Sequence, residues 1–245
     1  MSAIVTGEEY FRSITARASD RRARAAFQDL VLRSVRPGAR LFDFGAGPGI
    51  DARCYAERGL EVTAYDVDAG MREFFARYCR EFIVSGRIVL EQADYAEFLA
   101  QRPAASAAFD LVTSNFAPLN LVPDLPALLA RLHALLRPDG LVLASVLSPY
   151  CLSDYRYGWA WRNAPRLWRA GSYQLPGPRF PSTRRTLRSF AVAGAPWFTL
   201  EQVWRGLPDH SGSIGRGVAV RPGSAPWRVA LTSQFMFLRF RRRQH

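Results

Sequence analysis

The sequence predicts an α/β protein with a doubly wound, Rossmann-like sheet in three layers. Strand-like apolar runs alternate five times with helical patterns over the first 150 residues of the 245-residue chain. Parallel strands need crossover connections, which are usually helical and right-handed, so this alternation places helices on both faces of a parallel sheet. The first apolar run leads into a glycine-rich turn, "LFDFGAGPGID" (Leu41 to Asp51), which is typical of sheets that bind a ligand at their carboxyl edge.

Each element of the alternation has its own local signal. Ser19 or Asp20 is expected to cap the helix over 18–35, and Asp68 the helix over 69–84, while glycines and prolines end the helices. The expected strands are 40–44, 60–66, 87–94, 109–115 and 141–147, and the expected helices are 18–35, 50–59, 69–84, 95–102 and 124–136.

The regular alternation stops after residue 149. Residues 150–195 are rich in arginine, proline and aromatic residues, and we expect them to form an irregular, partly helical insertion. Two more strand-like runs, 198–207 and 231–242, follow. We therefore expect three parts: N-terminal helices and a ligand-binding core over 1–149, a substrate-capping insertion over 150–195, and two strands over 196–245 that complete a seven-stranded sheet with an antiparallel last strand.

The net charge of +12 comes entirely from the last 95 residues. The first 150 residues hold 17 arginines against 18 acidic residues, whereas the rest hold 16 arginines against three acidic residues. The chain has no lysine, so every basic side chain is a guanidinium suited to carboxylates, phosphates or aromatic faces. All six tryptophans also lie in this basic C-terminal part.

Composition also limits the cellular setting and the cofactors. The opening residues hold no apolar run of signal-peptide length, and no run is long enough to span a bilayer, so we expect a soluble, cytoplasmic protein. Cys54, Cys79 and Cys151 stand far apart with no C-x-x-C pair. They predict packed, reduced thiols, and no metal is expected.

Three alternate glycines, Gly45, Gly47 and Gly49, stand where a helix is expected to begin. They let backbone N–H groups approach a ligand closely at a helix N-terminus. The dinucleotide fingerprint G-x-G-x-x-G would need a small residue at Ile50, and Asp43 inside the strand would repel a pyrophosphate. A ligand with an ammonium or sulfonium charge suits this loop better than a nicotinamide dinucleotide.

Two more acids are expected at the same edge of the sheet. Asp66 ends the second strand, where a carboxylate accepts the hydroxyls of a ribose. Asp94 follows the third strand, beside Tyr95. Its carboxylate can accept a hydrogen bond from the exocyclic amine of an adenine, or it can simply cap the next helix. The ligand that these acids describe is cationic and adenosine-like.

The stretch from Arg40 to Leu147 resembles the class I S-adenosylmethionine-dependent methyltransferases of the small-molecule type. "LFDFGAGPG" is similar to the glycine loop of that family, "VTAYDVD" to its ribose segment and "LEQADYAEF" to its adenine segment. The block from Phe109 to Val146, with its "RPDG" turn, is similar to the fourth and fifth strands and the helix between them. The resemblance implies S-adenosylmethionine as methyl donor and S-adenosylhomocysteine as product.

Carried over position by position, the resemblance implies a set of cofactor-binding residues. The glycine loop would pack against the methionine part, Asp43 would lie near its amino group, and Asn115, which can also be only a polar strand end, would face the methyl sulfonium. Tyr10 and Arg17 lie where an N-terminal segment often closes over the cofactor in such enzymes. The implied set is Asp43, Gly45, Ala46, Gly47, Gly49, Asp66, Val67, Asp94, Tyr95, Asn115 and Phe116.

The sequence does not single out one residue as the general base that a hydroxyl acceptor requires. His210, in a loop beyond the sixth strand, is the best histidine candidate, and Asn115 could hold the acceptor near the methyl group. Asp154 and Tyr155 are further candidates, because an insertion after strand five commonly roofs the acceptor site in the resembling family.

The segment "YRYGWAWRNAPRLWRAG" leaves three interpretations open. Aromatic residues fall on one helical face and arginines on another, although Pro165 is expected to kink or end a helix there. The first interpretation is a lid over an apolar or aromatic acceptor with acidic groups. The second is a segment that lies on a membrane surface, and the third is a structural clasp with a solvated basic face. In the lid interpretation the substrate-binding residues are Trp159, Trp161, Trp168 and Arg162.

The fourth-strand segment bears on the substrate. Enzymes that methylate amino groups of nucleic-acid bases typically carry an Asn/Asp/Ser-Pro-Pro-aromatic run there, whereas this chain has "SNFAP", which counts against a DNA base. We expect O-methylation of a small molecule, as in secondary-metabolite biosynthesis, by a monomer or homodimer. The alternatives are an RNA, membrane-lipid or quinone methyltransferase that uses the basic C-terminal part, a non-catalytic cofactor-binding scaffold and, more distantly, a nicotinamide dehydrogenase.

Overall fold

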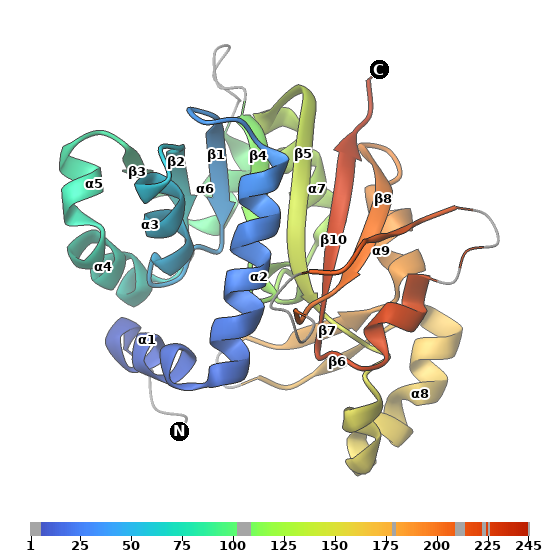
Figure 1. The fold of residues 1–245 in the computed structure, drawn as a ribbon. Helices are drawn as coiled ribbons and strands as arrows, with labels where there is room; N and C mark the ends of the chain where they lie inside the picture. The colour runs from blue at the N-terminus through green and yellow to red at the C-terminus, as the bar shows by residue number, and fades with distance from the viewer. Residues whose placement is uncertain are drawn as a thin grey trace.

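The computed structural model describes residues 6–101, 109–177, 180–208, 214–221, 224 and 226–244. A central sheet in the order β3-β2-β1-β4-β5-β10-β8-β9 carries helices on both faces (Figure 1). β10 is antiparallel to both of its neighbours, whereas the pairs from β3 to β5 are parallel. The predicted fold class is therefore confirmed. The strands are β1 (Arg40–Phe44), β2 (Glu61–Tyr65), β3 (Ile88–Leu90), β4 (Phe109–Ser114), β5 (Leu136–Leu147), β8 (Phe198–Arg205), β9 (Val218–Ala219) and β10 (Phe235–Arg242).

The described sheet has one strand more than the seven expected. The short strand β9 adds to the outer edge of β8, where Val203 pairs with Val218. β5 also begins earlier than the sequence predicts, because Leu136 pairs with Phe109 before the register shifts. The carboxyl ends of β1, β2 and β4 meet at the lower edge of the sheet in Figure 1.

Two hydrophobic cores hold the helices to the sheet. One contains Phe27, Tyr55 and Phe75 from the helices on one face, and the other contains Phe98 and Phe190 from the opposite face. The first face carries α2 (Ala18–Ser34), α3 (Ile50–Glu57) and α4 (Ala69–Tyr78), and the second carries α6 (Tyr95–Ala100), α7 (Leu125–Leu135) and α9 (Leu187–Gly194). The remaining helices are α1 (Gly7–Ala16), α5 (Arg80–Val84), α8 (Gly158–Ala170), η1 (Pro118–Asn120), η2 (Leu152–Arg156) and η3 (Pro226–Ala230).

The helix caps correct one expectation and confirm another. The predicted cap of α2 at Ser19 or Asp20 is wrong: α2 begins at Ala18, and its N-cap residue is Arg17, which is also the C-cap of α1 and forms no side-chain cap hydrogen bond. Asp68 does cap α4, since its Oδ1 accepts a hydrogen bond from the Met71 N–H at 2.8 Å. The single helix expected over 69–84 is divided into α4 and α5 at Cys79, whose thiol lies 3.5 Å from the Gly49 carbonyl oxygen.

The insertion is more ordered than the sequence predicts. It contains η2, α8, a hairpin of β6 (Ser172–Leu175) and β7 (Ser182–Arg185), and α9. Of the two outcomes expected at Pro165, a kink or the end of a helix, the second does not occur, because α8 continues for five more residues. Pro165 has no N–H to donate to the Trp161 carbonyl one turn earlier, so α8 continues with one backbone hydrogen bond fewer.

Asn120 ties the hairpin to the core. Its side chain is fully buried, its Nδ2 donates to the Thr183 carbonyl at 2.7 Å, and its Oδ1 accepts from the Leu147 N–H at 3.0 Å. Arg185 adds a bond from its guanidinium to the Leu119 carbonyl at 3.2 Å. The segment after β4 therefore connects β5 with the inserted hairpin.

We expect Asn120→Ala to lower the free energy of unfolding by about 2 kcal/mol, because two partly buried backbone groups lose their partners. Urea unfolding followed by circular dichroism measures the change. The control Gln92→Ala removes an exposed amide and is expected to cost less than about 0.5 kcal/mol. Equal stability of the two variants would contradict this role for Asn120.

Candidate functional site

The glycine loop between β1 and α3 depends on glycine at three positions. Gly45, Gly47 and Gly49 have φ values of 74°, 55° and 89°, a region that other L-residues rarely adopt. Side chains are also excluded: a Cβ at Gly45 would overlap Pro118, and one at Gly49 would lie 2.7 Å from Phe75. The Gly45 and Ala46 N–H groups donate to the Tyr65 carbonyl at 2.8 and 3.0 Å, which holds the loop beside the end of β2.

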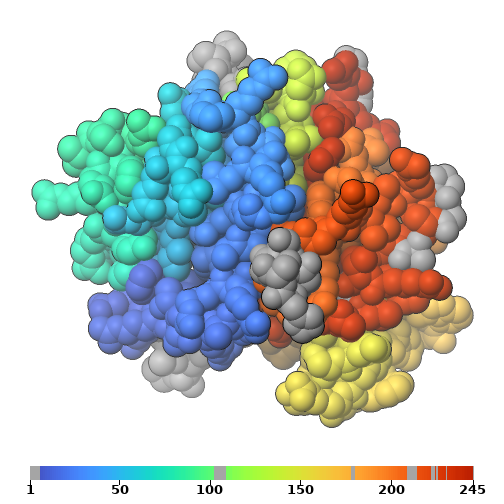
Figure 2. All heavy atoms as spheres, viewed as in Figure 1, coloured from blue at the N-terminus to red at the C-terminus, as the bar shows by residue number. Residues whose placement is uncertain are grey.

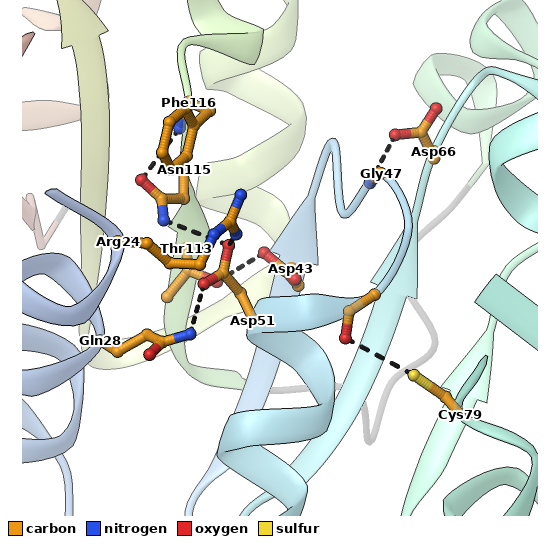
Figure 3. Close-up of polar contacts among 11 residues, drawn as sticks. Arg24, Gln28, Asp43, Gly47, Asp51, Asp66, Cys79, Thr113, Asn115 and Phe116 are labelled. Carbon is orange, nitrogen blue, oxygen red and sulfur yellow. Dashed lines mark hydrogen bonds and ion pairs between the residues drawn. The ribbon is translucent and has the colours of Figure 1, made fainter. Parts of the chain in front are cut away.

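Asp66, directly after β2, faces this loop (Figure 3). Its Oδ2 accepts from the Gly47 N–H and its Oδ1 from the Asp68 N–H, both at 2.8 Å. The residue is half-buried, and the neighbouring Val67 is 44% exposed. The structure thus brings the predicted ribose acid and the predicted glycine loop together.

Asp43 is an acid held almost entirely out of water. Only 2% of it is exposed; its Oδ1 accepts from the Thr113 hydroxyl at 2.9 Å, and its Oδ2 has no hydrogen-bond partner in the described part of the chain. Burial, reinforced by the negative charge of Asp51, raises the pKa of Asp43 to about 8, against the opposing effects of Thr113 and Arg24. The free protein therefore holds a largely protonated carboxyl at neutral pH.

Asp51, in the first turn of α3, joins three elements through one carboxylate (Figure 3). Its Oδ1 accepts from the Gln28 amide at 2.8 Å, while its Oδ2 forms an ion pair with Arg24 and accepts from the Asn115 amide at 3.1 Å. The sequence motifs alone do not mark Asp51, Arg24 or Gln28 as site residues. The available signal was two polar residues four apart on the helix before the glycine loop, together with an acid immediately after it.

The segment after β4 is held in an unusual backbone conformation. Phe116 and Ala117 have φ values of 60° and 70°, which cost a non-glycine residue about 1–3 kcal/mol. The Phe116 N–H donates to the Asn115 Oδ1 at 2.9 Å, and the Phe116 ring lies 4.4 Å from the Arg24 guanidinium carbon. Contacts with α2 and α3 therefore hold this segment in place.

Asp94 and Tyr95, the pair predicted to bind adenine, make contacts within α6 and with the core. The exposed Asp94 caps α6, since its Oδ1 accepts from the Glu97 N–H at 2.8 Å, which is the alternative that the sequence left open. Tyr95 packs against the core, and burial raises its pKa to about 12. An adenine-binding role for this pair stays a prediction.

The N-terminal helix α1 covers part of the glycine loop. The Tyr10 ring lies 3.9 Å from the position of a Cβ on Gly47, and burial raises the pKa of Tyr10. Arg17 is exposed at the junction of α1 and α2. The structure therefore places Tyr10 over the glycine loop, whereas a role for Arg17 at the cofactor stays a prediction.

The predicted substrate residues lie on α8, and the candidate base Tyr155 on η2, at the opposite end of the sheet's lower edge from α1 (Figure 1). Trp161 and Trp168 are 65% and 86% exposed, and Arg162 is also exposed. The Trp159 ring packs beside Tyr173, with centroids 6.3 Å apart, and the Tyr155 ring meets Trp161 edge-on at 5.0 Å. Their substrate-binding role stays a prediction, and His210 lies outside the described residues.

The described residues contain neither a cluster of metal ligands nor a membrane-spanning helix. No group of three or more His, Cys, Asp or Glu side chains among them could hold a metal ion. Within the same ranges, no helix is both long and apolar enough to cross a bilayer.

Comparison with known proteins places the chain among methyltransferases. The methyltransferase-domain family matches residues 12–191. Malonyl-[acyl-carrier protein] O-methyltransferase of Serratia marcescens is 32% identical over 130 residues, or 53% of this chain and 47% of that protein. Nocamycin O-methyltransferase of Saccharothrix syringae is 34% identical over 158 residues, or 62% and 50%. The chain thus spans about half the length of these curated relatives.

Solved structures share the fold across nearly the whole chain. The 1,6-didemethyltoxoflavin-N1-methyltransferase of Burkholderia thailandensis, crystallised with 1,6-didemethyltoxoflavin and S-adenosylhomocysteine, is 21% identical with a TM-score of 0.59 and covers 97% of this chain and 87% of its own. A TehB-like S-adenosylmethionine-dependent methyltransferase of Corynebacterium glutamicum, 15% identical, has a TM-score of 0.59 with 97% and 98% covered. The chain therefore belongs to the methyltransferase-domain family, with the class I S-adenosylmethionine-dependent fold that the sequence resemblance predicts.

Proposed function

We propose that this protein transfers a methyl group from S-adenosylmethionine to a small-molecule acceptor. The observation that carries the proposal is the buried carboxyl of Asp43 beside the glycine loop, with one oxygen lacking a hydrogen-bond partner among the described residues. A cationic ligand favours the ionised form of such a carboxyl, whereas a pyrophosphate opposes it. When bound, the cofactor supplies a methyl group on a positively charged sulfur.

The cofactor fits the residues that are present. The bonds from the Gly47 and Asp68 N–H groups hold the Asp66 carboxylate beside the glycine loop, and an ionised carboxylate is an acceptor suited to ribose hydroxyls. The glycine loop offers close backbone approach at the start of α3, and Tyr10 covers it. We assign the methionine part to this loop and the ribose to Asp66.

Asn115 acts as a positioning residue in this proposal. Its amide already bonds Asp51 and the Phe116 N–H, so it holds the segment after β4 beside the cofactor. An amide does not take up a proton at neutral pH, so the base must be another group. Asp154, Tyr155 and His210 remain the candidates for that role.

The acceptor that we propose is an apolar or aromatic molecule with acidic groups, methylated on oxygen. Two observations support it: the curated relatives described above are named as O-methyltransferases, and the insertion beside the carboxyl edge is rich in arginine. The solved neighbour from Burkholderia is named as an N1-methyltransferase, so the fold alone is compatible with either acceptor atom.

Calorimetric titration of S-adenosylhomocysteine tests the cofactor assignment. We expect micromolar affinity for the wild type and a loss of at least about tenfold, or 1.4 kcal/mol, in Asp66→Ala, because charged hydrogen bonds to the ribose disappear. NAD is expected to give no heat. The control Asp139→Ala removes an exposed carboxylate elsewhere and should bind like the wild type.

Thermal unfolding of each variant shows whether Asp66→Ala remains folded, since Asp66 also bonds the loop. A folded wild type that gives no heat with S-adenosylhomocysteine would overturn the cofactor assignment. Equal affinities of wild type and Asp66→Ala would remove Asp66 from the site while leaving the cofactor in place.

Asp43→Asn tests the charge of the buried carboxyl. The pKa of Asp43 is raised from 3.8 to about 8 on folding, so its contribution to stability falls as the pH rises between these values. We therefore expect Asp43→Asn to raise Tm relative to the wild type, by about 4 °C or more at pH 8 and by less at pH 5.

The same substitution is expected to remove a pH dependence of binding. In the wild type, affinity for S-adenosylmethionine should rise between pH 6 and about pH 8, because the cation binds best to the ionised Asp43. Titrations in buffers of different ionisation enthalpy should detect proton release, which Asp43→Asn abolishes. A pH-independent affinity with no proton release in the wild type would contradict this assignment.

A further inference from the structure

A cavity of about 1060 Å³ opens between α8, α9 and the start of α7. Its size is at the upper end of the range for small-molecule sites. Figure 2 shows the η2–α8 segment in yellow, at the lower edge of the molecule and away from the blue N-terminal helices. The cavity is thus lined by the insertion and by α7, not by the glycine loop.

The charges that line the cavity are mostly positive. Arg169, Arg185 and Arg188 line it, against a single acid, Asp124. The Asp124 Oδ1 already accepts from the Ala127 N–H at 3.0 Å as the cap of α7. Among the residues that the structure describes, no carboxylate lies within ion-pair distance of these three arginines, whereas the adjacent Arg184 lies 3.7 Å from Asp154.

Arg185 is the least hydrated of the three arginines. It is half-buried, burial lowers its pKa, and its guanidinium donates a hydrogen bond to the Leu119 carbonyl. A guanidinium stays protonated in proteins, so it remains a partly desolvated charge without a neighbouring anion. An anionic ligand would offset that cost.

The rest of the lining is suited to an apolar body. Tyr150, Leu167 and Trp168 present aromatic and aliphatic surface, and 86% of Trp168 is exposed. A ligand that covers the Trp168 ring would remove apolar surface from water. Charge at one side and apolar surface at the other define an amphiphilic ligand.

The short helix η1 lies between this cavity and the glycine loop. Pro118 occupies the space where Gly45 would carry a Cβ, and the next carbonyl, that of Leu119, accepts the bond from Arg185. A cavity arginine is therefore linked to the glycine loop through two consecutive residues.

We propose that this cavity binds an organic anion, a carboxylate or phosphate on an aromatic or aliphatic body. Arg185 and Arg188 hold the acidic group, and Trp168 covers the body. Binding in the cavity stands by itself, whereas the identification of this anion as the methyl acceptor rests on the proposed function.

Titration of the full chain with 2-naphthoate and with its neutral counterpart 2-naphthamide tests the proposal. We expect 2-naphthoate to bind more tightly than the amide and to lose at least tenfold in affinity in Arg185→Gln/Arg188→Gln. Arg188→Gln alone, an exposed side chain, is expected to lose part of that affinity without affecting the fold. Arg80→Gln, an exposed arginine on α5, changes the net charge by the same amount as Arg188→Gln alone and should bind like the wild type. 2-Naphthyl phosphate in a parallel titration ranks phosphate against carboxylate.

Equal binding of the acid and the amide, no binding of either anion, or equal losses in the cavity and Arg80 variants would overturn the proposal. Titrations repeated with saturating S-adenosylhomocysteine separate it from the proposed function. Binding of 2-naphthoate without any binding of S-adenosylhomocysteine would support the cavity and reject the methyltransferase assignment, and the reverse result would reject the cavity alone.

Discussion

The carboxylate of Asp51 is the contact on which the arrangement of the candidate site depends. One buried acid bonds Arg24 and Gln28 of α2 and Asn115 after β4, and it belongs itself to the first turn of α3. A buried charge is stable only when it is paired and hydrogen-bonded, so these partners are not interchangeable with solvent. The left-handed backbone of Phe116, beside the Arg24 guanidinium, is part of the same arrangement.

The fixed charge of Asp51 also shapes the properties of its neighbour. Asp43 lies deeper, and the negative field of Asp51 adds to burial in raising its pKa. Arg24 is engaged with Asp51 and only partly opposes this effect. At the carboxyl edge, the positive charge of Arg24 therefore does not fully balance the acidic groups. This excess of acidic groups favours a cationic cofactor.

Arginines in the C-terminal part serve different purposes. Arg184 is buried and bonds the Ser148 carbonyl at 2.7 Å, Arg239 and Arg241 pair with Glu201 on the sheet, and Arg185 faces the cavity. The sequence shows only a uniform excess of guanidinium groups. Their separation into structural and ligand-accessible sets follows from which of them reach a carbonyl or a carboxylate in the folded chain.

Local patterns in the sequence determined the fold class, the bounds of β1 and the positions of the glycine loop and Asp66, because strand alternation and positive φ are properties of a few consecutive residues. Only the tertiary structure decided which residues bond Asp51: Arg24 lies 27 residues away in the sequence and Gln28 lies 23 residues away. It also decided that Trp161 and Trp168 are exposed. It also decided that α8 continues past Pro165 and that Asp94 caps α6. These outcomes depend on which surfaces are buried and which backbone groups reach water, and such quantities arise only when distant segments pack together.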